Sequence, residues 1–190
     1  HCTCRRQRQM CIRDSLKYPI EKVVFGVNNE LVEAKFKGMF VTAVFGKLNI
    51  KTGEMVFINA GHESILTFDQ NKNYEYIKSE MPPIGIVKYF SESMVKSNTI
   101  NMKDKTFVVY TDGVTEGYLQ NGEELGSEGV QNIINNISEV TPKAIVESIE
   151  KKLNWGAEKL RDDITCMAIN IKNTESVSYT HLRAHETDSH

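Results

Sequence analysis

Three aspartates lie beside apolar runs that are typical of buried strands, and their carboxylates are the strongest candidates for chemistry. Asp112 comes directly after the run FVVY, and Asp162 and Asp163 come directly before the run ITCMAINI. A rigid strand fixes the position of the residue at its end, and the adjoining loop opens that residue to solvent. Carboxylates from distant parts of the chain can therefore meet at one edge of a sheet.

Clustered carboxylate oxygens, without cysteine or several histidines beside them, select Mg²⁺, Mn²⁺ or Ca²⁺ over Zn²⁺. Two such ions, bridged by a carboxylate, can generate hydroxide and hold a phosphate for in-line attack. The pattern therefore indicates a metal site formed by Asp112, Asp162 and Asp163. The alternative is that these acids cap turns and face water.

Two glycine-containing segments accompany these acids. Gly113 follows Asp112, and an Asp-Gly step predicts a turn because glycine adopts backbone angles that other residues resist. The second segment, which contains Asn59, Gly61 and His62, follows a predicted strand. His62 is either a hydrogen-bonded turn residue or a proton donor for an acid-rich cleft, since an imidazole titrates near neutral pH.

Other catalytic signatures do not occur in the sequence. It has no GxxxxGK[ST] phosphate-binding loop and no HExxH zinc motif. Ser64 follows in GHES, without the second glycine of a G-x-S-x-G nucleophile turn. Cys166 lies in the middle of a predicted strand with no obvious base beside it, which argues against a thiol nucleophile.

Composition narrows the class of protein. A chain of 190 residues suits one domain, alone or with tails. The net charge of −2 offers no basic surface for nucleic acid. No apolar run approaches the roughly 18 residues that a membrane span needs, and no apolar segment of a signal peptide follows the N-terminus. We therefore expect a cytoplasmic globular domain with no nucleic-acid or membrane partner.

Both ends of the chain look like translated sequencing-adapter or vector sequence. Residues 1–15 hold three of the four cysteines, and residues 175–190 hold three of the five histidines. Neither end shows hydrophobic periodicity, and the spacing of Cys2, Cys4 and Cys11 matches no usual zinc pattern. We therefore assign the domain to residues 16–174 and set both ends aside as non-native.

Hydrophobic periodicity predicts an α+β domain. Apolar residues at helical spacing predict helices over residues 19–35, 130–137 and 141–155, the last with Thr141 as N-cap and Pro142 in its first turn. Apolar and β-branched runs predict strands over residues 40–50, 54–60, 64–68, 74–77, 91–100, 107–110 and 164–171. Short polar turns join the early strands, so we expect an antiparallel sheet there.

Four runs in a fixed order carry a resemblance to one family. They are GMFVTAVFGKLNIKTGEMVFINAGH at 38–62, PPIG at 82–85, VVYTDGVTE at 108–116 and DDIT at 162–165. With these runs, residues 19–172 resemble the PPM-type metal-dependent serine/threonine phosphatases, in the bacterial branch of stage II sporulation protein E and the sigma-B regulatory phosphatases. The fold that this resemblance implies is an antiparallel β-sandwich flanked by helices (αββα).

The resemblance also implies a site and a reaction. Two Mn²⁺ or Mg²⁺ ions would activate a water that attacks the phosphorus of phosphoserine or phosphothreonine. Asp112 corresponds to the metal-binding aspartate of the family, and Asp162 to the ligand that opens its last motif, with Asp163 as the less favoured neighbour. Gly113 would let the loop approach the site, and Asn59, Gly61 and His62 match a segment that lines the cleft.

The partner that the resemblance implies is a phosphorylated anti-anti-sigma protein of the STAS type, and a homodimer is left open. One departure is important: the family begins with a D-x-S-G-H-G-like motif that supplies a bridging aspartate, and no equivalent precedes Leu16. We therefore expect a fold that is incomplete at the N-terminus and a fragment that is inactive. The alternative is a non-catalytic pseudophosphatase, or partner-binding module, of the same fold.

Overall fold

The structure is a computed structural model that describes residues 18–33, 39–88, 91–153, 163–172 and 176–182. It divides into two compact units, which are described separately. Unit 1 takes residues 1–49, 54–62 and 79–100, and unit 2 takes residues 50–53, 63–78 and 101–190. No helix among the described ranges is long and apolar enough to cross a membrane.

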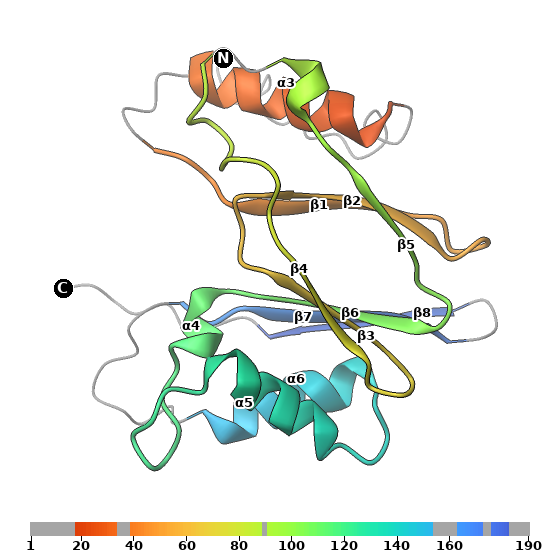
Figure 1. Ribbon diagram of the computed structural model, residues 1–190, viewed down its shortest axis with the longest axis vertical. Helices are drawn as coiled ribbons and strands as arrows, with labels where there is room; N and C mark the ends of the chain where they lie inside the picture. Colours follow the sequence, from red (N-terminus) through yellow and green to blue (C-terminus); the bar gives the residue numbers. More distant parts are fainter. Residues whose placement is uncertain (1–17, 34–38, 89–90, 154–162, 173–175, 183–190) are drawn as a thin grey trace, which may run out of the picture. The chain divides into compact units, whose positions relative to one another are not determined.

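Unit 1 is a small antiparallel sheet with one helix on a face. Helix α3 (Ile20–Glu33) lies over a sheet whose order is β1 (Ala43–Leu48), β2 (Glu54–Ala60) and β5 (Asn98–Asn101) (Figure 1). β1 and β2 form an antiparallel hairpin in which Ala43 pairs with Ala60 and Leu48 pairs with Met55. The apolar side chains of α3 and β2 bury one another in a core of Ile20, Val24, Ile58, Ala60, Met81, Ile84 and Val95.

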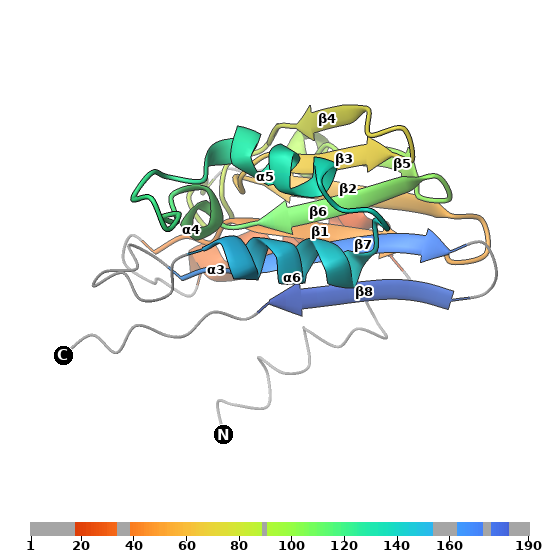
Figure 2. The same ribbon diagram turned by 90° about the horizontal axis from the view of Figure 1, so that it is seen from below.

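Unit 2 is a five-stranded antiparallel sheet. From one edge to the other its strands are β4 (Tyr74–Ile77), β3 (Ile65–Asp69), β6 (Lys105–Tyr110), β7 (Cys166–Lys172) and β8 (Ser176–Leu182) (Figure 2). Helices α5 (Gly126–Asn135) and α6 (Pro142–Lys152) lie on one face of this sheet (Figure 1). Alternate residues of the strands bury apolar side chains against these helices, and the core includes Leu66, Val108, Tyr110, Val130, Ile134, Ile145, Ile149 and Ala168.

The ends of the two helices show how local sequence sets their limits. The Thr141 hydroxyl accepts a hydrogen bond from the Ala144 N–H at 3.1 Å and Pro142 begins α6, which confirms the predicted cap. The predicted helix over 130–137 instead begins at Gly126, directly after Leu125, which is buried in the core of unit 2, and ends at Asn135.

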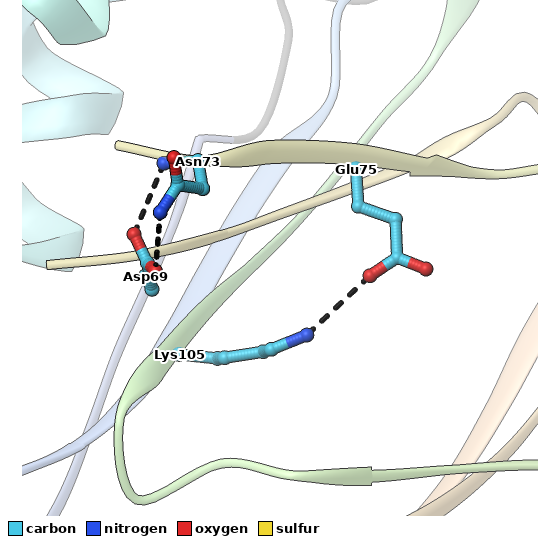
Figure 3. A network of polar contacts seen from close by, with 4 residues as sticks. All are labelled: Asp69, Asn73, Glu75 and Lys105. Carbon is cyan, nitrogen blue, oxygen red and sulfur yellow. Dashed lines mark hydrogen bonds and ion pairs between the residues drawn. The ribbon is translucent and has the colours of Figure 1, made fainter. Parts of the chain in front are cut away.

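The turn between β3 and β4 is a polar hairpin, as predicted. The Asp69 carboxylate accepts hydrogen bonds from the backbone N–H groups of Asn71 and Asn73 and from the Asn73 amide, which lowers the pKa of Asp69 (Figure 3). Lys105 on β6 pairs with Glu75 on β4 at 3.4 Å, across an exposed surface. The Lys72 ammonium donates to carbonyls at the C-terminal end of α5, so the hairpin is fastened to that helix.

Three segments differ from the predictions or extend them. The predicted strand over 91–100 is limited to β5, because residues 92–94 form a 3₁₀ turn (η1, Glu92–Met94). Residues 112–115, expected to begin a loop, form the short helix α4 (Asp112–Thr115). β8 lies within the segment 175–190 and pairs with β7. The prediction that residues 1–15 and 175–190 are non-native stays a prediction, as does the boundary of the domain at 16–174.

Candidate active site

The ends of β6 and β7 bring two of the predicted carboxylates into one region of unit 2. The ladder between these strands ends at the pair Tyr110–Cys166. It is extended by one hydrogen bond, because the Thr111 N–H donates to the Thr165 carbonyl at 3.0 Å. Asp112 follows Thr111 directly and Asp163 lies two residues before Thr165. We call Thr111, Asp112 and Asp163 the carboxylate corner.

The side chain of Thr111 joins the two halves of this corner. Its hydroxyl donates to the Asp163 carbonyl at 2.9 Å and accepts a hydrogen bond from the Thr165 N–H at 2.9 Å. The residues joined by the first bond are 52 positions apart in the sequence. The backbone around Asp163 is therefore held beside the start of α4.

Asp112 begins α4, and its side chain is exposed. One of its carboxylate oxygens accepts a hydrogen bond from the Gly113 N–H at 2.9 Å. Val114 is fully buried in the core of unit 2 and anchors this short helix. Gly113 is buried and is not among the glycines with positive φ, so the prediction of a glycine turn here is wrong: burial of Val114 favours a helical turn instead.

Asp163 is also exposed, whereas the next residue, Ile164, is buried. Asp162 lies outside the described residues. Within the described part of the chain, no group of three or more His, Cys, Asp or Glu side chains is gathered for a metal ion. The pair Asp112 and Asp163 is nevertheless a donor set of carboxylate oxygens, both open to solvent, and such a set fits Mg²⁺ or Mn²⁺.

The residues that precede this corner in the ladder are chemically inert at neutral pH. Burial raises the pKa of the Cys166 thiol to about 12, so the thiolate that a nucleophile requires is not formed. Burial also raises the pKa of Tyr110 above its usual value. The prediction that Cys166 is an unreactive strand residue agrees with this environment.

The predicted segment Asn59, Gly61 and His62 forms a tight turn in unit 1, at the end of β2. We call residues 59–62 the glycine turn. The buried Asn59 side chain accepts a hydrogen bond from the His62 N–H at 3.0 Å, and Gly61 has a φ of +67°. The Gly61 N–H donates to the Ser79 hydroxyl at 2.8 Å, and that hydroxyl lies 2.9 Å from the Asn59 carbonyl. His62 itself is half-buried.

The PPIG loop packs directly on this turn. A Cβ atom added to Gly61 would lie 2.4 Å from Cγ of Pro83, so only glycine fits there. The loop is tied in turn to α3 by the buried Asn28. Its side-chain oxygen accepts a hydrogen bond from the Gly85 N–H at 2.9 Å, and its amide donates to the Val87 carbonyl at 3.3 Å.

Sequence reasoning did not find three of these polar residues, namely Thr111, Ser79 and Asn28. Each one makes a hydrogen bond to a backbone group that lies at least 18 positions away. Only Thr111 carried a signal, because it stands between a strand and a candidate ligand.

A sequence profile of stage II sporulation protein E matches residues 11–172, which is most of the chain. The chain belongs to the stage II sporulation protein E family. This family is one of PPM-type phosphatase domains, so the resemblance drawn from the four sequence runs is confirmed.

Solved members of this family share the fold. The phosphatase domain of the cell-fate determinant SpoIIE from Bacillus subtilis aligns with a TM-score of 0.56 at 13% identity, covering 93% of this chain and 74% of that one. The RsbU and RsbW domains of a Mycobacterium tuberculosis protein align with a TM-score of 0.65 at 18% identity, covering 90% of this chain and 48% of that one. The predicted fold class, α+β with antiparallel sheets and flanking helices, is confirmed.

One curated relative matches this chain over only a small part of its own length. Protein IcfG from a Synechocystis strain is 25% identical over 140 residues, which is 69% of this chain. The chain spans only 20% of the length of that relative.

Proposed function

We propose that this chain carries metal ligands of a metal-dependent phosphoprotein phosphatase site, of the kind that hydrolyses phosphoserine or phosphothreonine. The observation that supports it best is the carboxylate corner, where Asp112 and Asp163 are held at neighbouring strand ends in a chain of the SpoIIE family. Asp162 precedes Asp163 in the sequence, and we propose it as a further ligand.

Two Mn²⁺ or Mg²⁺ ions, when bound, would supply the Lewis acid and a water of lowered pKa. Asp112 and Asp162 would bind them, with Asp163 as the neighbouring carboxylate. The Gly113 N–H orients the Asp112 carboxylate through the 2.9 Å hydrogen bond. The Bacillus subtilis domain was determined after presoaking with Mn, which makes Mn²⁺ the first ion to test.

The glycine turn is proposed to line the cleft for the phosphoprotein. Asn59 and Gly61 fix the backbone of the turn, and His62, which follows them, is proposed as a further residue of the cleft. The proposed substrate is a phosphorylated STAS-type anti-anti-sigma protein, and the proposed location is the cytoplasm. A homodimer is a further proposal, which rests on the family resemblance.

The first test is a calorimetric titration of the chain with Mn²⁺, together with phosphate release from a phosphoserine peptide. We expect Mn²⁺ binding that Asp112→Asn abolishes, because the substitution removes a charged ligand oxygen. Asp104→Asn is the matched control, since Asp104 is an exposed aspartate at the opposite end of β6.

The two readouts separate the possible functions. Mn²⁺-dependent phosphate release that is lost in Asp112→Asn would support the phosphatase. Mn²⁺ binding without phosphate release would support the expectation that a first aspartate motif is needed, and adding a segment with that motif should then restore release. If release stays absent after that addition, the domain is a non-catalytic partner-binding module. Equal Mn²⁺ binding by wild type and Asp112→Asn would contradict a site at Asp112.

A further inference from the structure

We propose that Thr111 is a positioning residue, which holds the backbone of Asp163 beside Asp112 and thereby sets the geometry of the proposed metal site. This inference rests on the proposed metal-dependent function and adds a neutral residue to it. Thr111 is not proposed as a ligand, because its hydroxyl is already used between two backbone groups.

The argument begins where the sheet ends. The β6–β7 ladder stops at the pair Tyr110–Cys166, and beyond it β6 turns into α4. The chain on the other side, residues 163–165, has no regular secondary structure. Thr111 makes three hydrogen bonds across this gap, one through its N–H to Thr165 and two through its hydroxyl to Thr165 and Asp163.

A hydroxyl is suited to this place because it can donate one hydrogen bond and accept another at once. It donates to the Asp163 carbonyl and accepts from the Thr165 N–H, both at 2.9 Å. Valine has nearly the same shape but can do neither. Because Asp163 and Thr165 are exposed, water can replace these bonds in a valine variant, so the fold should persist while the position of Asp163 becomes less defined.

The positions of the two sides of the carboxylate corner depend on Thr111 to different degrees. Asp112 is fixed by α4, through the buried Val114 and the Gly113 N–H. Asp163 is joined to that helix start by the bond from Thr111 to its carbonyl. Mg²⁺, for example, requires its oxygen ligands at about 2.0–2.1 Å, and loss of a residue that orients a ligand typically weakens metal binding by about 10- to 100-fold.

The experiment compares Mn²⁺ affinities of Thr111→Val, Thr111→Ser and Thr115→Val by calorimetry. Valine keeps the methyl group and loses the hydroxyl, whereas serine keeps the hydroxyl and loses the methyl group. We expect Thr111→Val to weaken Mn²⁺ binding about 10- to 100-fold and Thr111→Ser to bind close to wild type. Thr115→Val is the matched control, because the Thr115 hydroxyl donates to the Asp112 carbonyl, at 3.1 Å, rather than to the backbone of Asp163.

A second readout needs no metal. In the metal-free protein, hydrogen exchange of the Thr165 amide should be faster in Thr111→Val than in Thr111→Ser or Thr115→Val, because its acceptor has been removed. The urea midpoint of the whole chain should change little among the three variants. These measurements distinguish a local loss of position from a loss of folding.

The outcomes also separate this inference from the proposed function. If Asp112→Asn loses Mn²⁺ while Thr111→Val binds like wild type, the positioning role is overturned and the metal site stands. If affinity follows the methyl group instead, so that Thr111→Ser is the weaker variant, the hydroxyl is not the cause and the inference is also overturned. If Asp112→Asn binds Mn²⁺ like wild type, the metal site itself is wrong.

Discussion

The glycine turn of unit 1 and the carboxylate corner of unit 2 both contain residues that the sequence singles out, yet the two regions are built in different ways. The glycine turn is fixed by the buried Asn59, by a glycine with positive φ and by close contact with Pro83. In the carboxylate corner Asp112 and Asp163 are exposed, and the half-buried Thr111 makes hydrogen bonds to exposed backbone there. The glycine turn is therefore packed like a protein core, whereas the two aspartates of the carboxylate corner lie on the surface.

The difference predicts which region is sensitive to which change. A buried polar group that loses its partner costs stability, because water cannot reach the group left behind. An exposed carboxylate contributes little to folding, because most substitutions on the surface change the unfolding free energy by no more than about 0.5 kcal/mol. Substitutions in the glycine turn should therefore unfold unit 1, whereas substitutions in the carboxylate corner should remove metal binding and leave the fold intact.

The largest effect is expected for Gly61→Ala. The new Cβ would lie 2.4 Å from Pro83 and the residue would have to keep a φ of +67°, so we expect a loss of about 2–4 kcal/mol in the free energy of unfolding. Urea unfolding measures it. Gly122→Ala is the control, because Gly122 has a φ of +84° with nothing within 4 Å, and it should cost only about 1 kcal/mol. Equal costs would show that contact with Pro83 is unimportant.

A smaller effect is expected for Asn28→Ala, which removes the bonds from α3 to the PPIG loop. The Gly85 N–H and Val87 carbonyl would lose their partner, at about 1–3 kcal/mol. Urea unfolding and exchange of the Gly85 amide measure the loss. Asn29→Ala provides the comparison, since among the described residues the Asn29 side chain makes one hydrogen bond, a long 3.5 Å contact with Asn28. If the two variants unfold at the same urea concentration, the loop does not depend on α3.

The smallest effect on stability is expected for Asp112→Asn. The Asp112 side chain is exposed, and an asparagine oxygen can still accept the Gly113 N–H, so the change in unfolding free energy should stay within about 0.5 kcal/mol. Urea unfolding in the absence of metal measures it. A large destabilisation would contradict the contrast between the two regions, because it would make Asp112 a structural residue.

Much of the fold could be predicted from local signals. The apolar run of β2 indicated its bounds, and Thr141 with Pro142 indicated the start of α6, because these patterns act within a few residues. Helix α4 could not be predicted in this way. The Asp-Gly step favours a turn, and the helix forms because Val114 is buried among side chains from elsewhere in unit 2.

The candidate site was predictable only in its chemistry. The aspartates and the glycine turn stand out by residue type and by the motifs around them. The residues that hold them, Ser79, Asn28 and Thr111, act through hydrogen bonds to backbone far away in the sequence, so no local pattern indicates them. A hydroxyl or an amide at such a place looks like any other polar residue until the fold is known.

The 52-residue separation between Thr111 and Asp163 has a consequence for the order of folding events. A contact between residues so far apart has an entropic cost of loop closure. It therefore forms only when the pairing of β6 with β7 offsets that cost. The two aspartates cannot meet earlier, in a nascent hairpin or an isolated helix. Cation binding at this corner would therefore indicate that β6 and β7 have paired. A folding intermediate in which these strands are still apart would not bind the metal there.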